Sequence, residues 1–216
     1  MRKTKFENKI RLLALSLTTM TVVVLMLAGC AKKATEPEPS LDDLMNSAWS
    51  AFRQGSFSSA LGYFNQVLSR SAGHTDALNG KGWCLGILGD RPGALSAFNA
   101  GLAGAPANNS LRAGLAFTYA AMDSSPQAAA RDSTVLAADS LWSLGQRYVM
   151  SWDYLMDWRD LRVLLAEEYF VMGRFSESLA QVMKLDASVT VGADFSLAEN
   201  QAALLVEIER LSMTYK

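Results

Sequence analysis

The sequence predicts an all-α protein in which pairs of antiparallel helices stack as repeats. Two long segments, 44–68 and 78–102, match each other, so the chain repeats with a period of about 34 residues. Within each segment, apolar residues recur at the three- and four-residue spacing of a helix, and a glycine interrupts the pattern near the middle. The matched pairs are Leu44 and Leu78, Trp49 and Trp83, Gly55 and Gly89, Ala60 and Ala94, Phe64 and Phe98, and Leu68 and Leu102.

The residues that recur are those that a helix, a turn and a second helix require. Gly55 and Gly89 follow the first helix of each pair, where the chain needs a left-handed conformation that glycine adopts without strain. Ala60 and Ala94 place a small side chain where the two helices of one pair cross. Pro106 lies where the chain leaves the second helix, because a proline does not continue a helix.

A third unit follows the pattern less closely than the first two, and a fourth follows it well. In the third, Asp123 replaces the glycine, and Ser125 with Pro126 begins a second helix that is longer than usual. The turn at Gly173 follows Asp123 by more than one period, with about 16 residues in excess. The fourth unit matches at Leu165, Ala166, Tyr169, Gly173, Phe175 and Leu179.

The chain from 188 to 216 is expected to form a linker and a closing helix. Ser196 and Glu199 have the spacing of a capping box at the start of that helix. A stack of repeats needs a closing helix because its last unit otherwise exposes an apolar face. Asp157 is expected to cap the helix that opens the fourth unit.

The segment 41–187 resembles tetratricopeptide repeats in its period of about 34 residues and in the residues that recur. The units span 41–74, 75–108, 109–150 and 157–187. The resemblance implies a tetratricopeptide-type α-solenoid of about four helix pairs with a C-terminal capping helix. It also implies a right-handed superhelix whose concave face binds a protein or a peptide.

The same resemblance implies which side chains face the groove. In these repeats the first helix lines the concave face, and the residue after a conserved small residue points into it. Trp49, Trp83 and Phe117 occupy that position, and Phe52 and Phe170 occupy a second groove-facing position. Exposed aromatic side chains offer a large apolar contact area at low entropic cost. We expect these residues to contact a partner; the alternative is that they fill the inner packing of the stack.

The insertion between the third and fourth units is a second candidate contact surface. It holds the densest aromatic cluster of the chain, which consists of Tyr148, Trp152, Tyr154 and Trp158. Irregular insertions in repeat proteins often carry binding residues. Trp152 and Trp158 are therefore predicted to contact a partner, with a segment folded back on its neighbouring helices as the alternative.

The N-terminal segment 1–30 has the pattern of a secretory signal. Five basic residues precede an apolar stretch that extends from 12 to 28. The tetrapeptide LAGC that ends at Cys30 resembles the lipobox of bacterial lipoproteins, which implies cleavage before Cys30 and attachment of lipid to its thiol. We expect residues 1–29 to be removed and 30–40 to form a flexible tether. An uncleaved membrane anchor is the alternative.

Charge and the residue after the cysteine indicate where the chain acts. Ala31 follows Cys30, which resembles the outer-membrane address of Gram-negative lipoproteins, with the protein facing the periplasm. Without residues 1–29 the chain has 15 basic and 20 acidic residues, a net charge of −5. Because it is mildly acidic and has no basic cluster, it is not expected to bind nucleic acid.

Groups that carry catalysis or bind metals are sparse. His74 is the only histidine and has no cysteine close in sequence, so we expect neither a metal site nor a cofactor. Cys84 is expected to be a buried, inert thiol. The carboxylates between 153 and 168 are of the residue type that glycoside hydrolases use, so a hydrolase remains an alternative function. Glu167 and Glu168 are adjacent on a helix, point about 100° apart and are not expected to act as a pair.

The expected function is that of a lipid-anchored interaction module or scaffold of the bacterial cell envelope. Its partner is a protein or a peptide bound in the concave groove, and no catalysis is expected. Two alternatives remain. A carboxylate-based envelope hydrolase would be favoured by a pocket with two converging carboxylates, and a purely structural subunit would keep its groove filled.

Overall fold

The computed structural model describes residues 38–137, 149–150 and 156–215. The chain divides into two compact units, Met1–Pro39 and Ser40–Lys216, and every described helix belongs to the second. The predicted signal peptide and lipidation site lie outside the described residues. In the part of the chain that is described, no helix combines the length and the apolar character needed to cross a membrane.

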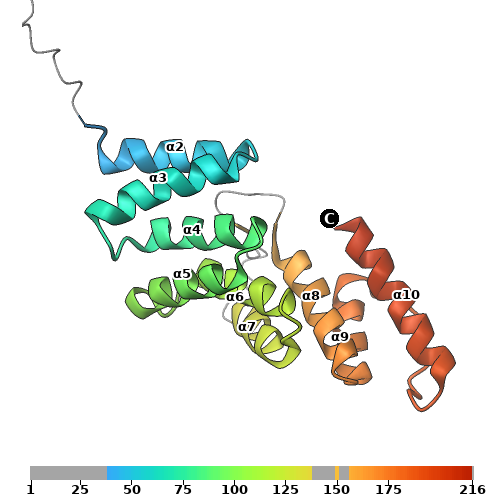
Figure 1. Cartoon of the computed structure of the whole chain (residues 1–216). Helices are drawn as coiled ribbons and strands as arrows, with labels where there is room; N and C mark the ends of the chain where they lie inside the picture. The colour runs from blue at the N-terminus through green and yellow to red at the C-terminus, as the bar shows by residue number, and fades with distance from the viewer. Residues whose placement is uncertain (1–37, 138–148, 151–155, 216) are drawn as a thin grey trace, which may run out of the picture. The chain divides into compact units, whose positions relative to one another are not determined.

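The described helices form four antiparallel pairs and a final helix, in chain order from blue to red in Figure 1. First helices contact one another along the stack, α2 with α4, α4 with α6 and α6 with α8, and α10 closes the last pair by contacting α8 and α9. First and second helices therefore form separate layers. The pairs are α2 (Leu41–Arg53) with α3 (Phe57–Arg70), α4 (Thr75–Ile87) with α5 (Arg91–Gly104), α6 (Asn109–Ala120) with α7 (Ser125–Ala137), and α8 (Trp158–Val171) with α9 (Phe175–Leu185), followed by α10 (Ala198–Thr214).

The turn inside each pair has the left-handed conformation that the sequence predicts. Gly55 and Gly89 have φ angles of 72° and 90°, and Gly173 has a φ of 72°. Asp123 takes the same place in the third pair with a φ of 53°. Aspartate is one of the few side chains that tolerate this region, so the third pair keeps its turn without the glycine.

Of the two helix caps that the sequence predicts, one forms and one does not. Asp157 caps α8 as predicted. His74 caps α4, where its Nδ1 atom accepts a hydrogen bond from the backbone of Ala77 at 3.2 Å. The capping box expected at Ser196 is wrong. Its hydroxyl donates to Asp194 Oδ1 at 2.6 Å, so a local turn around that aspartate uses the serine before α10 begins.

Neighbouring repeats are joined by a phenylalanine seated against a glycine. Phe64 of α3 lies so close to Gly80 of α4 that a Cβ atom on the glycine would overlap the ring, and Phe98 of α5 meets Gly114 of α6 in the same way. Both rings are buried. Because one repeat length separates the two contacts, the period of the sequence is also the period of the packing.

The insertion between α7 and α8 is closed at its base. Val149 and Asp157 form an isolated antiparallel bridge, and the Met150 backbone donates to the Met156 carbonyl at 2.9 Å. Met150 is buried and belongs to the core cluster that extends from α2 to the start of α8. Trp152 lies outside the described residues.

Candidate functional site

The aromatic residues predicted to line the groove are integrated into the repeat core. Trp49 packs edge-to-face on Phe64, with ring centroids 4.8 Å apart. Trp83 makes the equivalent contact with Phe98 at 5.6 Å and also touches Phe117 at 5.9 Å. Each repeated tryptophan therefore contacts the second helix of its own pair.

The two tryptophans differ in how their ring nitrogens are satisfied. Trp49 is half-buried, and its Nε1 donates to Asp76 Oδ2 in the first turn of the next repeat at 2.9 Å. Trp83 is 7% exposed, and its buried Nε1 has no hydrogen-bond partner. Ser110 stands in the next repeat where Asp76 stands in the second, and its side chain is shorter. The indole N–H is therefore hydrogen-bonded at the joint between the first and second repeats, and it lacks a partner at the joint between the second and third.

The second groove-facing position serves mainly to link the helices of one pair. Phe52 contacts Phe57 with centroids 5.2 Å apart, and Phe170 contacts Phe175 at 5.1 Å. Phe52 is buried, whereas Phe170 keeps part of its surface exposed.

Trp83 and Phe52 therefore depart from the expectation of exposed contact residues. Gly80 and Gly114 let the helices approach closely, and these aromatic rings fill the space between the layers. Trp49, Phe117, Phe170 and Trp158 remain partly accessible. Of these four, Phe170 also lines a pocket.

Cys84 follows Trp83 on α4 and is fully buried. Burial raises the pKa of its thiol to about 12. Because the thiolate is the reactive form, this cysteine is chemically inert at neutral pH, as the sequence predicts.

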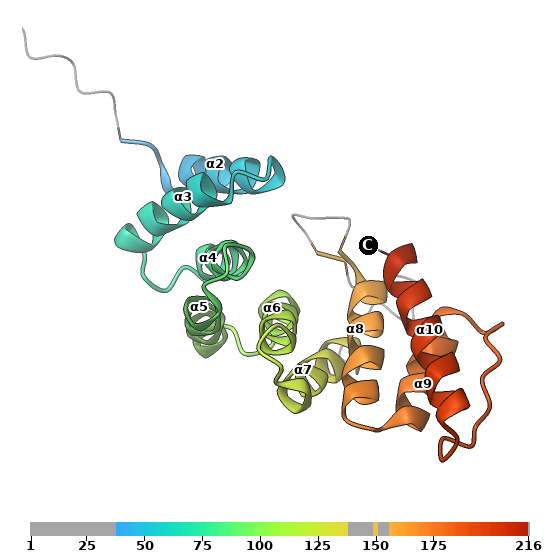
Figure 2. The same cartoon turned by 45° about the vertical axis from the view of Figure 1, so that its right-hand side comes forward.

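A pocket of about 470 Å³ opens where α6, α8 and α10 meet, and we call it the acidic pocket. Figure 2 shows α8 and α10 running beside each other. Helical spacing places Leu164, Glu167, Glu168 and Val171 on one face of α8, and Leu205, Ile208 and Glu209 on one face of α10. The lining residues are Ala120, Asp123, Ser125, Leu164, Glu167, Glu168, Phe170, Val171, Leu205, Ile208 and Glu209.

Two carboxyl groups give this region its electrostatic character. Glu168 is only 6% exposed, and its Oε2 atom has no hydrogen-bond partner. Asp132 on α7 is completely buried, and neither of its carboxyl oxygens has a partner. Burial, with the charge of Glu168 as a smaller cause, holds the pKa of Asp132 well above its ordinary range. Asp132 does not belong to the lining of the pocket.

Part of this site differs from what the sequence predicts. Glu167 and Glu168 are not expected to act together, because adjacent helical residues diverge, yet both line the acidic pocket, which wraps around that side of α8. Glu209 and Asp132 were not predicted. Asp132 carries a recognisable signal, since it shares a helix face with Ala128 and Val135. Glu209 carries none, because only the packing of α10 on α8 brings it to the pocket.

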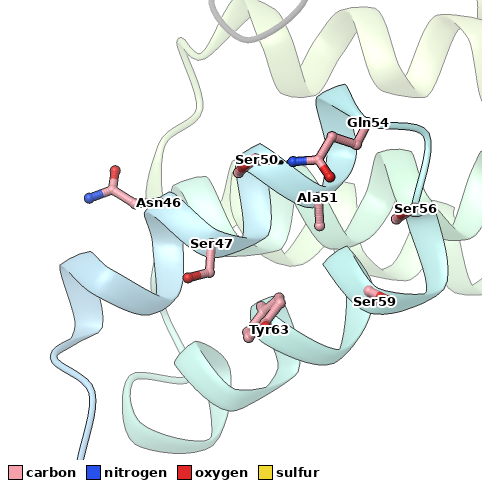
Figure 3. Close-up of a pocket in the computed structure, with 8 residues that line it drawn as sticks. All are labelled: Asn46, Ser47, Ser50, Ala51, Gln54, Ser56, Ser59 and Tyr63. Atoms are coloured by element: carbon pink, nitrogen blue, oxygen red, sulfur yellow. Dashed lines mark hydrogen bonds between the residues drawn. The ribbon is translucent and has the colours of Figure 1, made fainter.

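A second hollow, of about 540 Å³, lies on the first repeat and contrasts with the acidic pocket. Figure 3 shows its polar lining on α2 and α3, in which Gln54 donates to the Ser50 hydroxyl at 3.0 Å. Its lining contains no charged residue: Asn46, Ser47, Ser50, Ala51, Gln54, Ser56, Ser59 and Tyr63. Such a surface solvates the free face of the first repeat.

Comparisons with models of protein families and with the curated proteins found no match. Solved structures do match. MamA from Desulfovibrio magneticus RS-1 has a TM-score of 0.55 and 16% identity, covering 68% of this chain and 73% of that one. PilW, a type IV pilus biogenesis factor, has a TM-score of 0.56 and 17% identity, covering 79% of this chain and 69% of that one. Both are helical repeat proteins of the tetratricopeptide type.

The chain folds as a tetratricopeptide-type α-solenoid. The predicted fold class is therefore confirmed. At this level of identity the likeness shows the fold alone, so the function of the solenoid has to be argued from its own side chains.

Proposed function

We propose that this solenoid is a lipid-anchored interaction module of the bacterial cell envelope that binds a protein or peptide partner. The lipobox-like tetrapeptide supports removal of residues 1–29, lipidation of Cys30 and a tether over 30–40. The likeness to PilW, a type IV pilus biogenesis factor, supports an envelope location. Ala31 after the cysteine supports the outer membrane.

The observation that carries partner binding is the acidic pocket on the layer of first helices. It combines an apolar surface from Phe170, Val171 and Leu205 with carboxylates from three parts of the chain. Val171 is 72% exposed and Leu205 is 39% exposed, so apolar side chains at the rim are open to a partner. Concave surfaces that mix apolar contacts with a few polar groups are typical binding sites.

Partner capture tests this proposal with two matched substitutions. Photo-crosslinking in the envelope with the full chain should identify a partner that Val171→Arg loses and Val206→Arg retains. Val206 is 60% exposed on α10 and is outside the lining of the pocket, so it controls for charge and bulk. Failure to capture a partner, or equal losses by both variants, would count against binding at this pocket.

Lipid attachment is tested separately. Replacing Cys30 with serine should leave the chain without lipid and with residues 1–29 still attached, and mass spectrometry detects both changes. An unchanged mass in the variant would contradict lipidation at Cys30.

A carboxylate-based hydrolase is the second candidate, because Glu167, Glu168 and Glu209 line one pocket. Glycoside hydrolysis needs a protonated carboxyl that faces the substrate. Asp132, whose pKa is raised, is enclosed and outside the lining, which favours binding over hydrolysis. Release of reducing sugar from peptidoglycan by the full chain, abolished in Glu168→Gln, would reverse that preference.

A further inference from the structure

We propose that the acidic pocket is a receptor for a lysine or arginine side chain of a peptide segment, which rests on the proposed function in partner binding. The pocket collects four carboxylates, and its lining contains no lysine, arginine or histidine. Asp123 comes from the turn after α6, Glu167 and Glu168 come from α8, and Glu209 comes from α10. Such a surface attracts a cation and repels an acidic peptide.

Glu168 distinguishes this site from an ordinary acidic surface. Exposed carboxylates are solvated, but this side chain is 6% exposed and its Oε2 lacks a hydrogen-bond partner. A buried charge without a partner costs stability. Glu168 also lines the pocket, so an ammonium or guanidinium group bound there would offset its charge at short range.

Asp132 is consistent with a negative charge on Glu168 beside the pocket. Besides burial, which is the larger cause, the charge of Glu168 raises the pKa of Asp132, so the two carboxyl groups lie close together. Because burial keeps Asp132 protonated, the charge that a bound cation would offset is that of Glu168.

The apolar residues of the pocket suit the stem of a long basic side chain. Lysine and arginine bury their methylene chains along apolar surface while the charged end reaches polar groups. Leu164, Ile208 and Leu205 offer that surface, and the partly exposed ring of Phe170 offers a face for a cation. The volume of about 470 Å³ exceeds a single side chain and leaves room for flanking apolar residues of the segment.

A metal ion fits the pocket less well than an organic cation. Among the described residues, no group of three or more histidine, cysteine, aspartate or glutamate side chains is arranged to hold a metal ion. The carboxylates of the acidic pocket are distributed over three elements around apolar side chains. That arrangement matches an elongated cation rather than a compact one.

Fluorescence anisotropy with two labelled decapeptides tests the proposal. One alternates lysine with leucine, and the other has glutamate in place of lysine. The full chain in detergent at physiological ionic strength should bind the lysine peptide and not the glutamate peptide. Glu209→Gln and Glu168→Gln should each weaken binding by about fivefold to tenfold, the loss expected when one carboxylate charge beside the bound cation is removed.

Glu199→Gln is the matched control, because it removes the same charge from an exposed position on the same helix and lies outside the pocket. The lysine peptide should bind this variant as it binds the wild type. Because Glu209 is exposed, Glu209→Gln should leave the fold intact, so the proposal can be tested even if Glu168→Gln fails to fold. Equal affinity for both peptides, or equal weakening by Glu199→Gln, would overturn the cation receptor.

The two proposals fail in different ways. If crosslinking captures a partner through the Val171 surface while the lysine peptide does not bind, the interaction module stands and the cation receptor is wrong. If the lysine peptide binds and depends on Glu209, while no partner is captured, the receptor stands and the proposed envelope interaction is wrong.

Discussion

The joint between the first and second repeats and the joint between the third and fourth are built from different chemistry. In the first, Phe64 seats on Gly80, and Trp49 donates to Asp76 across the repeat boundary. In the other, α7 and α8 enclose Asp132 and Glu168, whose carboxyl oxygens include atoms without a partner. The buried side chains of the joint between the first and second repeats are aromatic rings that pack. The joint between the third and fourth repeats instead buries carboxyl groups, which its packing does not require.

This difference separates residues that repeat for structural reasons from residues that mark a site. Trp49 and Trp83 repeat because each packs on a phenylalanine of the second helix of its own pair, and Phe117 extends this packing by contacting Trp83. Asp132 and Glu168 do not repeat, and they cost stability in the folded chain. The irregular joint, and not the periodic one, is therefore where we place function.

The largest effect is expected from a substitution that disrupts the contact of Phe64 with Gly80 between the first and second repeats. Gly80→Ala adds a Cβ atom that overlaps the Phe64 ring, so we expect a loss of about 2 kcal/mol or more in the free energy of unfolding. Gly62→Ala is the control: this glycine lies on α3 with open space around it, so alanine should stabilise the helix by about 0.5–1 kcal/mol. Urea titrations followed by circular dichroism measure both. Equal and small effects would contradict the tight contact.

The next effect concerns the irregular joint. Asp132→Asn removes a buried ionisable group, so we expect a gain in the free energy of unfolding on the order of 1–2 kcal/mol at neutral pH. Folding raises the pKa of Asp132, so the folded state binds its proton more tightly than the unfolded state. Its contribution is therefore most favourable below the ordinary pKa of 3.8 and declines as the pH rises toward the folded-state pKa.

The advantage of Asp132→Asn should accordingly be largest at neutral pH and should shrink as the medium is acidified. Urea titrations of the wild type and the variant across that range measure it. A difference that does not vary with pH would show that Asp132 is not held protonated in the fold.

A smaller effect is expected at the joint between the second and third repeats, where one substitution would reproduce the hydrogen bond that Trp49 makes to Asp76. Ser110→Asp places a carboxylate at the second residue of α6, where Asp76 lies in α4, and offers the Trp83 Nε1 its missing acceptor. We expect a gain of about 1 kcal/mol in stability. Trp83→Phe in both backgrounds completes a double-mutant cycle. If the gain is the same without the indole nitrogen, it comes from the helix terminus alone.

The smallest effect is expected at Cys84. In a Cys30→Ser background, iodoacetamide should leave Cys84 unmodified at neutral pH, because the thiol is buried and burial raises its pKa to about 12. Urea should expose it, and mass spectrometry detects the adduct. Rapid labelling of the folded chain would mean that the core around Trp83 opens readily.

Much of the solenoid was predictable because its signals are local. The repeat period, the turn residues Gly55 and Gly89, and the cap at Asp157 each depend on neighbours within one or two helical turns. The Ser196 cap was not predictable from spacing, because Asp194 competes for the same hydroxyl. Whether Trp83 is exposed was also not predictable, since a groove position and a core position share the same helical register.

The sequence by itself determined the all-α repeat architecture, the number of helix pairs and the inert character of Cys84, because periodicity and turn chemistry specify helices residue by residue. Only the tertiary structure decided that Trp83 and Phe52 belong to the core, because the distance between helix layers depends on contacts such as Phe64 with Gly80. It alone brought Asp123, Glu168 and Glu209 to one pocket. Residues so far apart in the chain meet only through the stacking of α6, α8 and α10, which no local pattern records.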